Sequence, residues 1–129
     1  MADKKKVLLV DDDPDFLDSI ETLLKRNGYD VVTGFDGNEA IVKAKSEKPD
    51  AMVLDVMMPK KDGYKACAEL KADPDTADIP ILLLTAVASH VSTTSYTHQD
   101  GLNTEADDYL DKGCEPEEIL ERVKDLLED

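Results

Sequence analysis

The stretch AMVLDVMMPKKDG, residues 51–63, sets the apolar run Ala51 to Leu54 directly before Asp55. An uninterrupted apolar run of this length is typical of a strand buried on both faces, as in a parallel sheet covered by helices. Val56, two methionines, a proline and a turn sequence follow the aspartate. The chain thus holds a carboxylate among apolar neighbours where a buried strand ends, and this position needs an explanation.

Similar apolar runs recur along the chain, with amphipathic helical segments between them. This alternation predicts an α/β fold, a doubly wound five-stranded parallel sheet with helices on both faces. The predicted strands are Val7 to Val10, Val31 to Phe35, Ala51 to Leu54, Ile79 to Leu84, and the weaker pair Tyr109 and Leu110. The predicted helices lie within residues 12–29, 37–50, 63–75 and 115–129.

Each predicted helix has one apolar face. In the first helix, an aspartate before Pro14 serves as N-cap, and Gly28 marks the end. The residues expected to face the sheet are Leu17, Ile20, Leu24, Ala40, Ile41, Ala44, Cys67, Ile119, Val123, Leu126 and Leu127.

The composition excludes several classes of protein. The chain has 129 residues, enough for one domain, with 30 acidic against 15 basic residues and a formal net charge of -15. This charge disfavours binding to a nucleic-acid backbone or an anionic membrane, so we expect neither as a partner. No apolar run approaches the length of about 18 residues that a transmembrane helix needs, and no secretory signal is recognisable, which predicts a cytoplasmic protein. Cys67 and Cys114 lack metal-site spacing and are expected to be free thiols.

Acidic residues gather where the predicted strands end. In a doubly wound sheet, ligands bind beyond the carboxyl ends of the strands. Carboxylates that meet there repel one another unless a cation lies among them, and Mg2+ prefers oxygen ligands. With a lysine and a hydroxyl nearby, such an edge suits a phosphoryl group beside a carboxylate nucleophile. The residues expected at this edge are Asp11, Asp12, Asp55, Thr85 and Lys112.

Four motifs, VLLVDDDPD, AMVLDVMMPKKDG, LLLTA and ADDYLDK, follow one another over nearly the whole chain. Together they resemble the receiver domain of two-component response regulators, in the stand-alone form of the chemotaxis receivers. The resemblance implies a flavodoxin-like (βα)5 fold with strand order 2-1-3-4-5. It also implies that residues 1–129 form a single receiver domain without an output domain.

The same resemblance assigns roles to individual residues. It implies that Asp55 is the phosphoacceptor and that Mg2+, or Mn2+ in its place, binds Asp11, Asp12, Asp55 and the backbone carbonyl of Met57. The hydroxyl and lysine of the family match Thr85 and Lys112. Its aromatic switch residue matches Tyr109, and Thr85 takes part in the same switch.

The function implied is phosphoryl transfer to Asp55 from a sensor histidine kinase or a histidine phosphotransfer protein. The signal then leaves by contact with a downstream protein. Such a chain is not a conventional enzyme, because it catalyses only its own phosphorylation and dephosphorylation. Met57 and Val87, two residues beyond Asp55 and Thr85, carry no polar group to orient water, so we expect slow dephosphorylation.

The sequence departs from the family pattern in three places. Gly113 follows the lysine where the family has a proline after a cis bond. A cis bond before a non-proline residue costs about 2.5–4 kcal/mol, so we expect a trans or a strained bond before Gly113. Glu105 stands where the family often has glycine, and the segment between Thr85 and Lys112 is longer than usual. Within it, the composition of Ser89 to Glu105 predicts a short or frayed helix and a long loop.

Other interpretations remain open at this stage. Taken alone, residues 11–13 are an ordinary acidic helix N-terminus, and Asp55 is a strand-ending turn residue. The departures favour, as the alternative function, a phosphorylation-independent, receiver-like interaction module. A metal-dependent phosphatase would need a second catalytic acid, which the sequence VMMP after Asp55 does not offer. A nucleotide-binding flavodoxin-type protein would need a glycine-rich phosphate loop.

Overall fold

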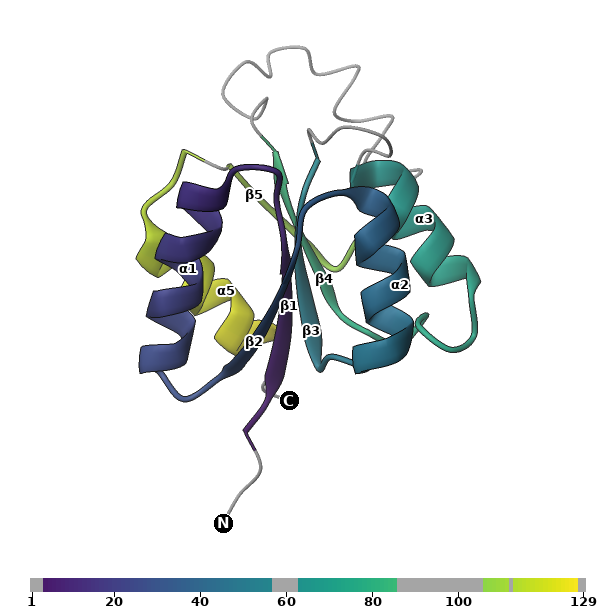
Figure 1. Ribbon diagram of the computed structural model, residues 1–129, viewed down its shortest axis with the longest axis horizontal. Coiled ribbons are helices and arrows are strands. Elements are labelled where there is room, and N and C mark those ends of the chain that lie inside the picture. The colour runs from purple at the N-terminus through teal and green to yellow at the C-terminus, as the bar shows by residue number, and fades with distance from the viewer. Residues whose placement is uncertain (1–3, 57–62, 86–105, 112, 128–129) are drawn as a thin grey trace.

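Five apolar segments form one sheet in the part of the chain that the structure describes (Figure 1). The computed structural model describes residues 4–56, 63–85, 106–111 and 113–127. The strands are β1 (Lys6–Val10), β2 (Asp30–Gly34), β3 (Ala51–Asp55), β4 (Ile81–Thr85) and β5 (Asp108–Asp111). The helices are α1 (Pro14–Arg26), α2 (Gly37–Glu47), α3 (Gly63–Ala72) and α5 (Pro116–Leu127).

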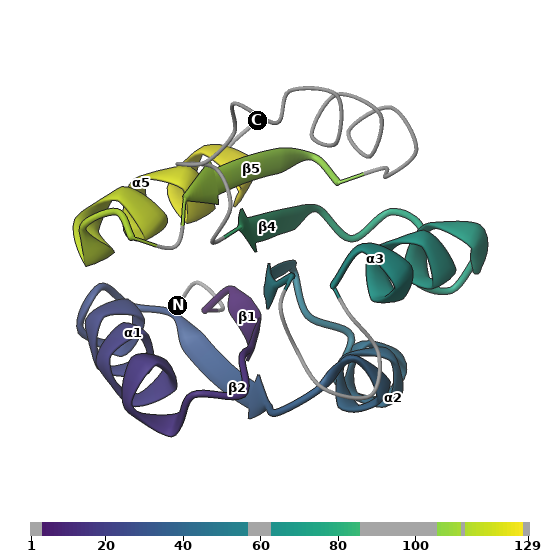
Figure 2. The same ribbon diagram turned by 90° about the horizontal axis from the view of Figure 1, so that it is seen from above.

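The sheet is parallel throughout, with strand order β2-β1-β3-β4-β5. Seen from above, α1 and α5 cover one face of the sheet and α2 and α3 cover the other (Figure 2). The predicted fold class and strand order are therefore confirmed. The segment Ser89 to Glu105, for which we expected a frayed helix and a loop, lies outside the described residues.

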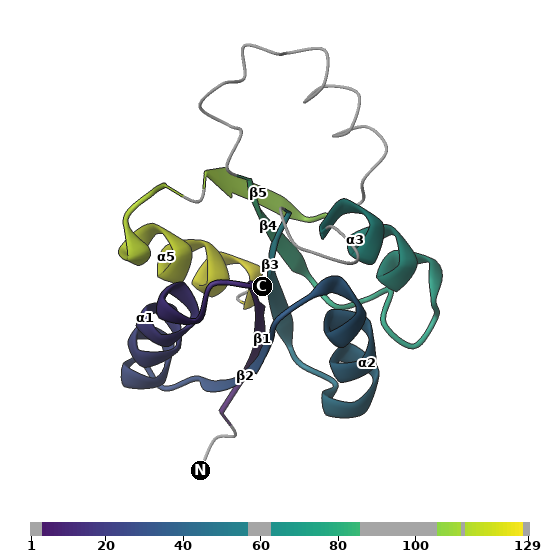
Figure 3. The same cartoon turned by 45° about the horizontal axis from the view of Figure 1, so that its top comes forward.

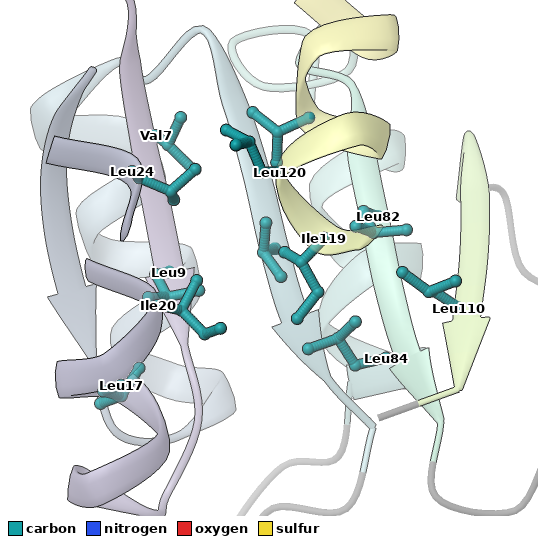
Figure 4. Packing of buried hydrophobic residues seen from close by; sticks show 12 residues of the cluster. Val7, Leu9, Leu17, Ile20, Leu24, Leu82, Leu84, Leu110, Ile119 and Leu120 are labelled. Atoms are coloured by element: carbon teal, nitrogen blue, oxygen red, sulfur yellow. The ribbon is translucent and has the colours of Figure 1, made fainter. Parts of the chain in front are cut away.

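The core has two layers because side chains of a strand point alternately to opposite faces. Both β3 and β4 are buried along their whole length, as the apolar runs predicted. Burying each large apolar side chain stabilises the fold by about 1.5–3 kcal/mol. The layer beneath α1 and α5 contains Val7, Leu9, Val53, Leu82 and Leu84 with Leu17, Ile20, Leu24, Ile119 and Val123 (Figure 4). The opposite layer contains Leu8, Val10, Met52, Leu54, Ile81 and Leu83 with Ala40, Ala44, Cys67 and Leu70.

The first helix begins and ends as its sequence predicted. Asp13 Oδ1 accepts hydrogen bonds from the backbone N–H groups of Asp15 at 3.0 Å and Phe16 at 3.4 Å, and Pro14 opens the helix. Gly28 follows the end with φ 92°, a backbone conformation that favours glycine. Among the described residues, no helix has the length and apolar character that crossing a membrane requires.

Most predicted strand boundaries differ from the observed ones by one or two residues, and in two places the prediction extended a strand too far. Strand β2 ends at Gly34, because the N–H of Phe35 donates to Glu39 Oε1 at 2.9 Å instead of joining the sheet. Strand β4 begins at Ile81 and not at Ile79. Ile79 N–H donates to the carbonyl of Thr76 at 3.0 Å within a turn, and the proline after it has no N–H to offer a neighbouring strand.

Candidate functional site

The carboxyl ends of three central strands bring the predicted site residues to one edge of the sheet. Strand β1 runs directly into Asp11, β3 ends at Asp55, and β4 ends at Thr85. Asp55 pairs in register with Leu84, so Thr85 lies one residue beyond the level of Asp55. Neighbouring strands are about 4.7–4.9 Å apart, which makes these strand ends close neighbours. Figure 3 turns this edge toward the viewer.

Asp11, Asp12 and Asp55 form an acidic cluster at this edge. One carboxylate oxygen from each residue lies within 4.8 Å of those of the other two. Asp11 is 0% exposed and Asp55 is 1% exposed, whereas Asp12 is exposed to solvent. Carboxylates at this separation disfavour one another's ionisation unless donors or a cation balance their charge. The three acidic residues predicted to act together are thus brought together by the fold.

Two hydrogen bonds hold Asp11, the buried one of the two aspartates that directly follow β1. The N–H of Asp11 donates to the carbonyl of Gly34 at 3.1 Å, which extends the pairing of β1 with β2 by one residue. Asp11 Oδ1 in turn accepts the N–H of Asp13 at 2.9 Å. The chain therefore turns sharply between β1 and α1, and Asp12 at the turn remains exposed.

The donor set fits a small divalent cation. Mg2+ binds oxygen ligands at about 2.0–2.1 Å in an octahedron, so its adjacent ligands lie about 3 Å apart and its opposite ligands about 4 Å apart. The 4.8 Å span of the three carboxylates is only slightly wider. A small side-chain movement would close the difference, and Mg2+ usually keeps several waters as its remaining ligands. Asp11, Asp12 and Asp55 are therefore the described residues that would hold the metal.

The remaining predicted residues divide into two groups. Thr85 is 8% exposed at the end of β4, next to the level of Asp55. Tyr109 lies on the edge strand β5, where it is 36% exposed and its carbonyl accepts a hydrogen bond from Arg122 Nη1 at 3.4 Å. Met57, Val87 and Lys112 lie outside the described residues, and so does the bond between Lys112 and Gly113.

Gly113, one of the three departures from the family pattern, lies in the turn after β5. Gly113 N–H donates to Asp111 Oδ1 at 3.0 Å, and Cys114 N–H donates to the carbonyl of Asp111 at 3.0 Å. Burial and the nearby carboxylates of Glu118 and Asp111 raise the pKa of the Cys114 thiol. The thiol is therefore protonated at neutral pH and a poor nucleophile.

Two residues near the site have roles that our sequence analysis missed. Asp36 Oδ1 caps α2 by accepting the N–H of Glu39 at 2.8 Å, and Glu39 Oε1 accepts the N–H of Phe35 at 2.9 Å. The arrangement resembles a capping box, except that Glu39 accepts the N–H of the residue before the N-cap, and the Asp-x-x-Glu spacing in the sequence is a signal for it. The contact of Gly34 with Asp11 has no comparable signal, because it joins two strands that are distant in sequence.

Comparison with known proteins supports one family. The family model described as the response regulator receiver domain matches residues 7–124. The chain is 43% identical over 123 residues to the alkaline phosphatase synthesis transcriptional regulatory protein PhoP of Bacillus subtilis, covering 95% of this chain and 48% of PhoP. It is 40% identical over 122 residues to the DNA-binding dual master transcriptional regulator RpaA of Synechocystis, covering 95% of this chain and 48% of RpaA.

A solved structure agrees with this match. The receiver domain of the sensor histidine kinase PA1611 from Pseudomonas aeruginosa superimposes with a TM-score of 0.83 at 30% identity, covering 97% of this chain and 98% of that chain. That structure has a magnesium ion coordinated in its active site cleft.

The expectation that nucleic acid is not among the partners was wrong for this group of proteins. RpaA is by name a DNA-binding transcriptional regulator, and PhoP is a transcriptional regulatory protein. The chain spans about half the length of these curated relatives. A net charge of -15 describes only the matched segment, so it does not determine what a longer relative binds.

The family match extends over most of the chain, and its sheet has the predicted strand order. The chain therefore belongs to the response regulator receiver domains of two-component systems.

Proposed function

We propose that this receiver domain accepts a phosphoryl group on Asp55 from a phosphohistidine, in a reaction that requires Mg2+. The observation that carries the proposal is the position of Asp55. Asp55 is 1% exposed at the end of a fully buried strand, and one of its carboxylate oxygens lies within 4.8 Å of carboxylate oxygens of Asp11 and Asp12. Carboxylates this close disfavour one another's ionisation, and a metal-dependent reaction at this edge makes use of the arrangement.

The reaction is an in-line displacement on phosphorus. One oxygen of the Asp55 carboxylate attacks the phosphorus, the bond from phosphorus to the donor imidazole nitrogen breaks, and its electron pair remains on the imidazole. Asp11, Asp12 and Asp55 would hold Mg2+, with the Met57 carbonyl as a further ligand, and the bound ion supplies charge neutralisation for the phosphoryl oxygens. Thr85 donates its hydroxyl to one of these oxygens, and Lys112 adds a positive charge.

The donor in this proposal is a sensor histidine kinase or a histidine phosphotransfer protein. Phosphorylation then shifts an existing conformational equilibrium in which Thr85 moves toward the phosphoryl group and Tyr109 turns inward. The outward position of Tyr109, which is 36% exposed, is consistent with the unphosphorylated state in this scheme. The altered surface is read by another protein or protein domain, and the names of PhoP and RpaA favour control of transcription as the outcome.

The first test is intact mass spectrometry of the protein after incubation with Mg2+ and a small acyl phosphate, beside Asp55→Asn. We expect a gain of one phosphoryl mass in the parent protein alone, because the amide cannot act as the nucleophile. If the parent gains no mass while Mg2+ binding is confirmed separately, the phosphoryl-transfer proposal is refuted. The phosphorylation-independent interaction module would then be the better description.

The stability of the acyl phosphate is a second prediction. Met57 and Val87 carry no polar side chain to orient an attacking water, so we expect slow self-dephosphorylation. The lifetime is measured by following the loss of phosphoryl mass after removal of the donor. A lifetime of only seconds without a phosphatase would contradict this expectation.

A further inference from the structure

Gly63, the first residue of α3, lies against the backbone of the residue that we propose as phosphoacceptor. Its N–H donates to the carbonyl of Val56 at 2.9 Å, and Gly63 is buried. A Cβ atom added to Gly63 would lie 2.5 Å from the carbonyl oxygen of Asp55 and 2.8 Å from the Cα atom of Val56. Real Cβ atoms essentially never approach other atoms closer than 3.0 Å. An alanine at this position therefore cannot be accommodated without movement.

The need for glycine here is one of space and not of backbone conformation. Among the described glycines, Gly28 is the one with a positive φ. Gly63 therefore has an ordinary backbone conformation that other residues adopt without strain. Any cost of a side chain at Gly63 comes from its contact with the Asp55–Val56 peptide.

That peptide is also held from its other side. Val56 N–H donates to the carbonyl of Leu84 at 2.9 Å, and Asp55 pairs in register with Leu84. Val56 is 2% exposed. The peptide is thus clamped between β4 and the start of α3, and the atoms that a Cβ would meet are backbone atoms. A side chain at Gly63 must displace either α3 or the end of β3 that carries Asp55.

We propose that Gly63 is a positioning residue for Asp55, an inference that rests on the proposed phosphoacceptor role. By lacking a side chain, Gly63 lets the start of α3 press the Asp55–Val56 peptide against β4, and this fixes the Asp55 carboxylate beside Asp11 and Asp12. With a methyl group there, the contact would have to open from 2.5 Å to at least 3.0 Å, and to 3.4 Å for an ordinary contact. Reactive groups must be placed within about 0.5 Å, and a displacement of about 1 Å costs about 100-fold in rate.

The test compares Gly63→Ala with the parent protein in two assays. The first follows phosphoryl transfer from acetyl phosphate by intact mass at saturating donor and Mg2+. The second titrates Mg2+ alone, without donor. For the folded fraction we expect the rate constant to fall by about 10- to 100-fold and the Mg2+ dissociation constant to rise several-fold, because the displaced Asp55 serves both reactions. A purely structural glycine would lower stability but leave both values unchanged in the folded protein.

The matched control is Gly28→Ala. Gly28 has φ +92° and nothing within 4 Å of an added Cβ, so its replacement strains the backbone far from the site. We expect this control to lose stability in urea unfolding with an unchanged transfer rate and Mg2+ affinity. Wild-type rates in Gly63→Ala, or an equal loss of rate in Gly28→Ala, would overturn the positioning role.

Gly63→Ala is also made in a stabilised background, so that the test does not depend on how well the single variant folds. Lys48, which ends α2, has φ 48° and occupies the left-handed region, where glycine is less strained. Lys48→Gly is therefore expected to raise stability away from the site.

Failure of the proposed function and failure of this inference give different results. A parent protein that takes up no phosphoryl group refutes the proposed function, whereas equal uptake by parent and Gly63→Ala refutes only this inference.

Discussion

The two edges of the sheet use carboxylates in opposite ways. At the amino edge, where strands begin, Asp107 Oδ2 lies 3.0 Å from Lys71 Nζ and accepts the N–H of Ile81 at 2.8 Å. Asp50 Oδ2 at the same edge accepts the N–H of Lys6 at 2.8 Å. These carboxylates face donors, and each contact ties one segment to a distant one.

At the carboxyl edge, carboxylates also lie close to one another. Asp11, Asp12 and Asp55 lie within 4.8 Å, and two of the three are almost fully buried. Like charges this close cost stability, whereas an acid beside a lysine and an N–H group adds to it. The difference teaches that contacts at the amino edge hold distant segments together, whereas the carboxyl edge has the acidic residues that we propose as the cation site. Neutralising an acid should therefore have opposite effects at the two edges.

The largest effect on stability is expected from Asp107→Ala at the amino edge. Lys71 is only 10% exposed and would lose its carboxylate, and the Ile81 N–H would lose its acceptor. Lys71 Nζ keeps the carbonyls of Ala77 at 3.2 Å and Ile79 at 2.8 Å. We therefore expect a loss of about 2 kcal/mol in unfolding free energy, below the 3–5 kcal/mol typical of a broken buried pair. Urea unfolding measures it.

The control for this variant is Asp78→Ala, an exposed acid in the turn before β4, which should change stability by less than about 0.5 kcal/mol. An equal loss in both variants would show that the contacts of Asp107 are not what holds the amino edge.

An effect of opposite sign is expected from Asp11→Asn at the carboxyl edge. The asparagine keeps the side-chain oxygen that accepts the N–H of Asp13 at 2.9 Å, but removes one of the crowded charges. Without Mg2+, we expect the unfolding free energy to rise by about 1 kcal/mol. Mg2+ at ten times its dissociation constant should stabilise the parent by about 1.4 kcal/mol and the variant much less. Chelator-treated and Mg2+-loaded samples are compared by urea unfolding, and a less stable metal-free variant would disprove the contrast.

The smallest effect is expected from Asp73, a partly exposed acid that belongs to neither edge of the sheet. The backbone N–H of Asp75 and the ammonium of Lys45 hold the pKa of the Asp73 carboxyl below its usual value of 3.8. A lowered folded-state pKa contributes stability that is present above pH 3.8 and is lost as pH falls through the folded pKa. Asp73→Asn should therefore make the acid-side loss of stability shallower below about pH 4. Identical acid limbs in parent and variant would contradict this.

Much of the fold could be predicted because its signals are local. The apolar runs identify the strands, and Asp13, Pro14 and Gly28 delimit α1 through contacts within a few residues. Errors occurred where a local contact competes with the sheet, as at Phe35, whose N–H is taken by the Glu39 side chain. The expectation about nucleic acid was wrong because net charge describes the segment in hand and not the longer proteins related to it.

The sequence by itself determined the fold class, the family and the meeting of Asp11, Asp12 and Asp55, because parallel strands must bring their carboxyl ends to one edge. The tertiary structure decided which other residues contact the two edges of the sheet. Asp107 contacts Lys71, which is 36 positions away in the sequence, and Gly63 packs against the peptide that follows Asp55. Neither contact could be predicted from the type of residue alone. Contacts between segments far apart in sequence depend on packing in three dimensions, and no local pattern encodes them.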